Sequence, residues 1–370
     1  MRIEAMVSVR VACLAVAMVL VPAPEAMGAA SFHHVGGLPG AQPAGGLRDV
    51  SADGKVAVGG SLGADGRERA VYWTERDGLV PIGGGGMSMA RGVSADGSVI
   101  VGSDGDRAFR WTKDGGMTYL FPLGGEALAV SADGSVVAAS NGGAYRWTAA
   151  GAERLGDNTF PWDISLDGST IVGTVSDTPQ RLAAVRWTGQ GMQRLGDLYG
   201  GNGLSVPFAV SGDGSVVAGS SYVLGTPAKA FVWRDGVGMS ELPGVPAGLS
   251  FSPRAMSADG SVMVGDAGNA TGSWAALWDA AHGMRLLHDV LGRDNGIDLA
   301  GWTLYAATGV SADGTTIAGS ATNPAGPNEG FVAVVPEPAA GAATVVLGSM
   351  LLRRRRREPR GGARSVGSYL

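Results

Sequence analysis

The stretch VSADGKVAVGG, from Val50 to Gly60, is the first complete copy of a phrase that occurs seven times in the chain. A period near 43 residues is typical of the four-stranded blades of β-propellers. The spacings between successive copies are 43, 37, 34, 46, 46 and 54 residues. The shared core, Ser-x-Asp-Gly, begins at Ser51, Ser94, Ser131, Ser165, Ser211, Ser257 and Ser311.

Each repeat divides into four segments with strand character. The first ends at the apolar residue before the serine, and the second is an apolar run after Asp-Gly, as in SVIVG (98–102). The third carries Trp in six of seven copies, as in AFRWT (108–112), and has Ala333 in the seventh. The fourth is short, as in GMQRLG (191–196). Trp at equivalent positions indicates packing between blades rather than six binding platforms.

The last repeat lacks a fourth segment, because the sequence passes from Val334 directly into VPEP (335–338). The stretch SFHHVGGLPG (31–40) resembles a fourth segment and stands before the first repeat. A ring accounts for both observations, since the N-terminal strand would complete the last blade and close the sheet edges. We therefore predict that residues 31–335 form an all-β, seven-bladed β-propeller of four-stranded blades, with an open β-solenoid as the alternative fold.

One aspartate recurs in every repeat and is the obvious candidate for a functional role. It precedes Gly between two strands, and Asp-Gly is a strong hairpin signal because both residues tolerate positive φ. A catalytic site needs one asymmetric group of residues, whereas this feature recurs seven times. The pattern favours turns, with calcium binding at the turns as the alternative. The repeated residues are Asp53, Asp96, Asp133, Asp167, Asp213, Asp259 and Asp313.

The sequence contains no nucleophile elbow, His-Glu-x-x-His or phosphate-loop motif, so no catalytic residue, metal ligand or cofactor is predicted. A propeller brings distant loops together at its axis, which leaves paired carboxylates for acid–base chemistry open there. The longest irregular segment, residues 288–305, contains Asp294, Asp298 and Trp302 and is a candidate ligand loop. A short helix packed over the ring is the alternative.

The repeats resemble a known family. VSADGSVIVG (93–102) and RAFRWT (107–112), with GM..LG segments between copies, are similar to the HAF-type extracellular repeat of bacterial exported proteins. The resemblance covers nearly all of residues 31–335. It implies an extracellular β-propeller and transfers no catalytic residue.

The N-terminal residues 1–30 have the pattern of a secretory signal peptide. Arg2 and Arg10 are followed by an apolar run and by small residues that end in AMGAA (26–30). Cys13, the only cysteine, lies within this segment, so the mature protein would contain no thiol.

The C-terminal residues 336–357 resemble the PEP-CTERM sorting signal, and a polar tail follows at 358–370. The motif Pro336, Glu337 and Pro338 is followed by the apolar stretch 339–352, which is short for a membrane span. The resemblance implies recognition by an exosortase-type membrane transpeptidase after Sec-type export. A stop-transfer role on the cytoplasmic side is expected for Arg353, Arg354, Arg355, Arg356 and Arg357.

Residues 31–335 carry a net charge of about −10, which makes nucleic acid an improbable partner. Together these features predict an exported protein of the cell envelope or extracellular space, transiently anchored in the membrane by its C-terminal segment. We expect a non-enzymatic binding or structural module for extracellular polysaccharide or protein. The alternative is a secreted propeller enzyme, such as a polysaccharide lyase or hydrolase, with its site on the axis.

Overall fold

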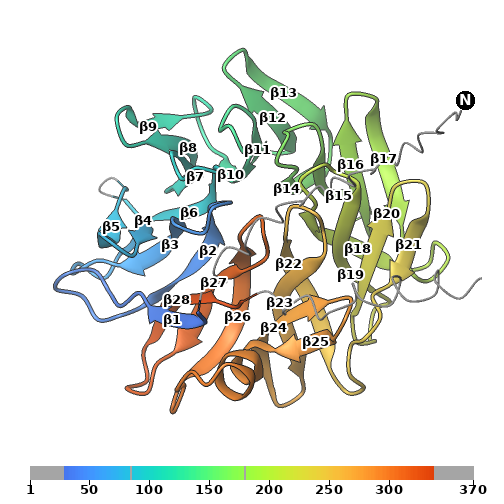
Figure 1. The fold of residues 1–370 in the computed structure, drawn as a ribbon. Helices are drawn as coiled ribbons and strands as arrows, with labels where there is room; N and C mark the ends of the chain where they lie inside the picture. Colours follow the sequence, from blue (N-terminus) through green and yellow to red (C-terminus); the bar gives the residue numbers. More distant parts are fainter. Residues whose placement is uncertain (1–28, 84–85, 179–180, 337–370) are drawn as a thin grey trace, which may run out of the picture.

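Seven four-stranded antiparallel sheets stand around a central axis in the computed structural model, which describes residues 29–83, 86–178 and 181–336 (Figure 1). The predicted all-β, seven-bladed propeller is therefore confirmed, and the open solenoid is wrong. The phrase with Ser-x-Asp-Gly lies between the first and second strands of every blade, as its composition predicted.

The blades follow the chain in order, with the innermost strand of each blade first. Blade 1 contains β2 (Gly45–Val50), β3 (Ala57–Leu62), β4 (Glu68–Thr74) and β5 (Gly78–Pro81). Blade 2 contains β6 (Ser88–Val93), β7 (Val99–Asp104), β8 (Arg107–Thr112) and β9 (Gly116–Tyr119). Blade 3 contains β10 (Glu126–Val130), β11 (Val137–Ser140), β12 (Ala144–Thr148) and β13 (Gly151–Gly156).

Blade 4 contains β14 (Thr159–Ile164), β15 (Ile171–Thr178), β16 (Arg181–Thr188) and β17 (Gly191–Gly196). Blade 5 contains β18 (Leu204–Val210), β19 (Val216–Tyr222), β20 (Lys229–Arg234) and β21 (Gly238–Glu241). Blade 6 contains β22 (Ser250–Met256), β23 (Val262–Asn269), β24 (Gly272–Asp279) and β25 (Gly283–Leu286). Blade 7 contains β26 (Thr303–Val310), β27 (Thr316–Thr322), β28 (Asn328–Val334) and β1 (Ser31–His34).

The N-terminal strand β1 closes the ring, as predicted. It pairs antiparallel with β28, with Ser31 opposite Val334 and His34 opposite Phe331. The Phe32 ring stacks on Phe331 with 5.7 Å between centroids. Blade 7 is thus built from both ends of the propeller sequence, and β1 covers the edge that β28 would otherwise leave open.

The serine and aspartate of each repeat form the same hydrogen-bonded turn in all seven blades. The buried serine hydroxyl donates to the aspartate Oδ1 over 2.5–2.8 Å. It also accepts the backbone N–H five residues later, over 2.9–3.0 Å. The aspartate Oδ1 accepts the N–H two residues after itself, over 2.9–3.1 Å. These contacts assign the seven aspartates to the turns, as the pattern favoured.

The turns also join neighbouring blades. Gly54 has φ +73° and lies against Thr316 of blade 7, where an added Cβ would come within 2.9 Å of the Thr316 Cβ. Glycine is needed here both for its backbone conformation and for the close approach. At five blade junctions the residue after the turn serine donates its N–H to the equivalent carbonyl of the next blade, over 2.8–3.1 Å: Ala95 to Ala132, Ala132 to Leu166, Gly212 to Ala258, Ala258 to Ala312, and Ala312 to Ala52.

The repeated tryptophans pack between blades rather than forming a binding surface. Trp187 and Trp278 are buried, and their indole N–H groups donate to the carbonyls of Leu155 (3.1 Å) and Pro243 (2.7 Å) of the preceding blades. In the seventh blade the smaller Ala333 is buried at the same place. The prediction that these residues serve packing is therefore confirmed.

The segment after blade 6 contains a short helical turn, α1 (Leu287–Asp289) and η1 (Val290–Asp294). Leu287, Val290 and Leu291 are buried in the apolar cluster between blades 6 and 7. The helix is therefore explained by packing, as the alternative interpretation of this segment proposed.

Several sequence features fall outside the described residues: residues 1–28 of the predicted signal peptide, Glu337, Pro338 and the arginine cluster at 353–357. Within the described residues, no helix has the length and hydrophobicity needed to span a membrane.

Candidate active site

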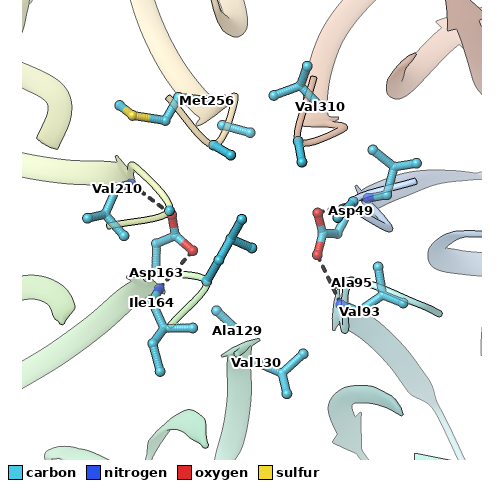
Figure 2. A pocket seen from close by; sticks show the side chains of 17 residues that line it. Asp49, Val93, Ala95, Ala129, Val130, Asp163, Ile164, Val210, Met256 and Val310 are labelled. Carbon is cyan, nitrogen blue, oxygen red and sulfur yellow. Dashed lines mark hydrogen bonds between the residues drawn. The ribbon is translucent and has the colours of Figure 1, made fainter. Parts of the chain in front are cut away.

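A pocket of about 100 Å³ lies on the axis, where the inner strands of all seven blades converge (Figure 2). Every blade contributes residues to its lining, and they come from the positions next to the turn serine. The apolar residue before the serine contributes in every blade, from Val50 in blade 1 to Val310 in blade 7. The residue after the serine contributes in six blades, all except blade 3. The volume accommodates a few water molecules rather than a sugar ring.

Two residues break this symmetry. The position two residues before the turn serine is Gly or Ala in five blades, but it is Asp49 in blade 1 and Asp163 in blade 4. They are the only charged residues among the seventeen that line the pocket, all of which the structure describes. Figure 2 shows the two carboxyl groups facing each other across the pocket.

Both carboxyl groups are held by backbone N–H groups of two adjacent blades. Asp49 accepts the N–H of Val50 at 2.8 Å and that of Val93, in blade 2, at 3.0 Å. Asp163 accepts the N–H of Ile164 at 2.8 Å and that of Val210, in blade 5, at 2.9 Å. Each of the four carboxyl oxygens thus receives one bond and keeps a second lone pair. The bonds fix the orientation of both side chains before a ligand arrives.

The surroundings raise the pKa of both carboxyl groups toward neutrality. Burial raises the pKa of Asp49 to about 7, and it outweighs the lowering by the N–H groups of Val93 and Val50. The charge of Asp163 raises it slightly further. Burial likewise raises the pKa of Asp163 to about 6, against the lowering by Val210 and Ile164. Near pH 6.5 the pair therefore holds about one proton, which provides one acid and one base in the same pocket.

A second, larger pocket of about 640 Å³ lies between blades 6 and 7. It brings together residues that the sequence singled out separately: Asp259, Asp294, Asp313 and Pro336. The pocket also contains Arg285 and a His–Asp pair.

In this second pocket, His282 Nδ1 lies 2.8 Å from Asp279 Oδ1, and Arg285 Nη2 donates to Asp279 Oδ2 at 2.6 Å. Hydrogen bonds hold the pKa of Asp259, Asp279 and Asp313 below the usual value, despite partial burial. These three carboxylates are therefore ionised at neutral pH and are not suited to act as general acids.

The other residues of the candidate ligand loop do not converge on either pocket. Asp298 accepts the N–H of Ala300 at 3.0 Å within its own turn. Trp302 packs against the closing strand, with ring centroids 5.2 Å from Phe32 and 5.5 Å from His34. Of the three predicted residues, only Asp294 lines a pocket.

Within the described residues, no group of three or more His, Cys, Asp or Glu side chains is arranged to hold a metal ion. The turn aspartates lie in separate blades, and each is engaged by its own serine.

The sequence contains a signal for the axial pair that the sequence analysis did not use. When the seven repeats are aligned on the turn serine, the position two residues earlier reads Asp, Gly, Ala, Asp, Ala, Ala and Gly. A carboxylate at an inner-strand position that holds Gly or Ala in the other blades departs from the pattern of the repeat. Such departures mark candidate sites in an otherwise uniform repeat protein.

No family model matches the chain, and no curated protein sequence matches it. Solved structures do match. An oligogalacturonate lyase from Vibrio parahaemolyticus superposes with a TM-score of 0.57 at 14% identity, over 84% of this chain and 98% of that one. A puromycin-hydrolyzing peptidase from Mycobacterium tuberculosis gives 0.55 at 16%, over 83% of this chain and 54% of the peptidase.

The propeller domain of the Trilobed protease from Pyrococcus furiosus gives a TM-score of 0.53 at 10% identity, over 78% of this chain and 95% of that one. At these identities the likeness establishes the fold and transfers no residue. This chain spans only about half the length of the peptidase.

The comparisons correct one prediction from the sequence. A non-enzymatic binding or structural module was expected, but the similar structures include a lyase and peptidases. The expectation was based on uniform repeats and scarce histidine, and it overlooked the two carboxyl groups that the ring brings together. The main prediction is wrong, and the alternative of a propeller enzyme is the better supported one.

Proposed function

We propose that this protein is a propeller enzyme that hydrolyses glycosidic bonds at its axis, with Asp49 as general acid and Asp163 as general base. The observation that carries the proposal is the axial pair itself. Two fixed carboxyl groups with pKa values of about 7 and about 6 face each other in one pocket. Perturbed carboxyl groups of this kind concentrate at functional sites.

The proposed reaction follows from the protonation states. Near pH 6.5 protonated Asp49 donates its proton to the glycosidic oxygen while the bond from that oxygen to the anomeric carbon breaks. Ionised Asp163 accepts a proton from a water molecule, whose oxygen forms the new bond to the anomeric carbon. The small pocket holds this water, and the sugar rings on both sides of the scissile bond would lie at the mouth of the pocket.

The pocket chemistry favours a hydrolase over a polysaccharide lyase. A lyase removes the proton beside a uronate carboxylate, and this step needs a cation to neutralise that carboxylate. The lining of the axial pocket contains two carboxyl groups and no cationic side chain. The acidic protein would also repel a polyuronate. A neutral extracellular polysaccharide is therefore the substrate class that fits.

Purified protein incubated with hydroxyethyl cellulose, laminarin and galactomannan tests this proposal by the release of reducing ends. Asp49→Asn and Asp163→Asn should each reduce the rate by roughly 10²- to 10⁴-fold. Asp197→Asn is the matched control, because the Asp197 Oδ1 also accepts two backbone N–H groups, of Tyr199 and Gly201, but in a loop away from the axis. Equal rates for wild type and both axial variants, or no cleavage by wild type, would overturn the proposal.

We further propose that the protein is exported by Sec-type machinery and sorted to the cell envelope by an exosortase-type transpeptidase acting at Pro336, Glu337 and Pro338. The support is the three-part C-terminal layout and the N-terminal signal pattern. Cell fractionation of the wild type and of a variant with all three residues changed to Ala tests the sorting step. Identical distributions would contradict it.

A further inference from the structure

The inner strand of every blade contains a β-bulge at the residue three positions before the turn serine. In blade 4 the register shifts between Pro161 and Asp163, which leaves Trp162 unpaired, and the same shift recurs in the other six blades. A bulge takes one residue out of the ladder and redirects its side chain. The seven bulge residues, in blade order, are Arg48, Arg91, Leu128, Trp162, Phe208, Arg254 and Thr308.

The bulge residues of blades 4, 5 and 6 contact one another from strand to strand. The Trp162 and Phe208 rings lie edge to face with 5.2 Å between centroids. The guanidinium carbon of Arg254 lies 4.9 Å from the centroid of the Phe208 ring. Phe160, in the same strand as Trp162, braces the indole at 5.0 Å. The result is a continuous aromatic surface on the inner strands β14 and β18, which Arg254 of β22 extends.

This aromatic surface is open and has polar groups at one end. Trp162 is 36% exposed, whereas four of the repeat tryptophans, Trp73, Trp187, Trp233 and Trp278, are buried. Arg254 bonds Asp266 through Nε at 2.9 Å and Nη2 at 2.8 Å. The Arg254 side chain is 41% exposed, so its guanidinium is accessible at this end of the surface, whereas the Oδ1 of Asp266 is buried.

The charge of the guanidinium at the end of this surface is compensated, because Arg254 is paired with Asp266 at 2.8 Å. The matching ligand is therefore uncharged, with an apolar face for the indole and a hydroxyl group for Arg254. A neutral pyranose ring has both.

From this geometry we infer that Trp162 and Phe208 form a stacking platform for a pyranose ring of the polysaccharide, with Arg254 as a hydroxyl partner. The inference deepens the proposed hydrolase function and rests on it for the position of the scissile bond. Trp162 directly precedes Asp163 in β14, and the inference requires that a sugar on the platform extend its neighbouring glycosidic bond toward the axial pair.

Affinity electrophoresis and calorimetry with hydroxyethyl cellulose, laminarin and galactomannan test the platform in the full chain carrying Asp163→Asn, which prevents turnover. Trp162→Ala should weaken binding about tenfold or more, while Trp162→Phe should retain most of it. Tyr119→Ala is the matched control, because Tyr119 is an aromatic residue of similar exposure, 40%, on the outermost strand β9. Circular dichroism confirms that each variant is folded.

The outcomes separate the two proposals. If the wild type binds a glycan and cleaves none, the hydrolase proposal fails, and the loss of binding in Trp162→Ala still supports the platform. If the axial variants abolish cleavage while Trp162→Ala binds within twofold of its parent, the platform fails and the hydrolase stands. No retention of any of the three glycans overturns the platform.

Discussion

Gly54 in the first turn of the propeller lies directly against Thr316 in the last blade, and the Thr316 side chain occupies the space that a Cβ on Gly54 would need. This contact joins blades 1 and 7, the two blades that meet where the ring closes. The same contact, between a turn glycine and the residue five positions after the turn serine of the preceding blade, recurs around the ring.

Gly54→Ala should destabilise the protein by roughly 2–4 kcal/mol, because it adds a steric clash to the cost of a positive φ. Gly66→Ala is the matched control. Gly66 has nearly the same φ, +72°, but no atom lies within 4 Å of its added Cβ. The control should cost only about 1–2 kcal/mol. Urea denaturation of both variants measures the difference, and equal losses would show that the inter-blade contact is unimportant.

Deleting Ser31–His34 should lower the melting temperature by at least about 10 °C. The deletion exposes the edge of β28, uncovers the fully buried Phe331 and removes its stacking with Phe32. Deletion of residues 358–370 serves as the control for a shortened chain. Differential scanning calorimetry provides the measurement, and an unchanged melting temperature would contradict closure by β1.

Ser131→Ala should cost roughly 1–3 kcal/mol, because the buried hydroxyl both donates to Asp133 at 2.7 Å and accepts the Val136 N–H at 3.0 Å. Ser135→Ala removes a hydroxyl that also bonds Asp133, at 2.8 Å, but at the exposed side of the turn. The cost there should stay below about 0.5 kcal/mol.

The same pair of variants can be followed by NMR. The hydrogen bond from Ser131 is the largest of several that lower the pKa of Asp133 to about 2. In Ser131→Ala this pKa should rise toward its ordinary value of 3.8. A pKa that stays near 2 would show that the turn backbone alone stabilises the carboxylate.

Asp49→Ala should become relatively more stable as the pH rises. In the folded wild type, burial raises the pKa of Asp49 from 3.8 to about 7, so the folded state binds this proton more tightly than the unfolded chain does. Its contribution to stability is fully present below about pH 4 and is lost as the pH rises through 7. Alanine occupies the equivalent position in blades 3, 5 and 6. It has no titratable group, so the variant lacks this contribution to the pH dependence of stability.

The difference in unfolding free energy between Asp49→Ala and wild type should therefore shift in favour of the variant by roughly 2–4 kcal/mol between pH 4 and pH 8. Denaturant unfolding at several pH values measures it. A constant difference would show that Asp49 has an ordinary pKa, and it would remove the basis for its role as general acid.

The repeated part of this protein could be predicted from its sequence because every blade has the same four strands and the same turn between the first two. The buried Ser51, the exposed Asp53 and the positive-φ Gly54 are local turn chemistry, and local chemistry is readable from neighbouring residues. The closing strand was predictable from a missing fourth segment in the last repeat.

The axial site was not predicted, because it depends on which residues a closed ring places opposite each other. Asp49 and Asp163 belong to blades 1 and 4, and neither has a catalytic motif around it. Burial where the inner strands converge, rather than any neighbour in sequence, raises their pKa values. The same holds for Trp162, whose exposure depends on a bulge that strand patterns do not reveal.

The bulge in each inner strand has a consequence for how this protein can change over evolution. The residue it contains makes no ladder contact, so its identity can vary without disturbing the frame that holds the ring together. Seven such positions, one per blade, lie on the inner strands around the axis. Thr308 is an exception to this freedom, because its hydroxyl donates to the Leu47 carbonyl at 2.8 Å and joins blade 7 to blade 1. A lineage could therefore exchange one ligand preference for another by substitutions at Arg48 or Leu128, while the turns keep the protein stable. Related sequences should accordingly diverge first at these positions and last at the turn serines.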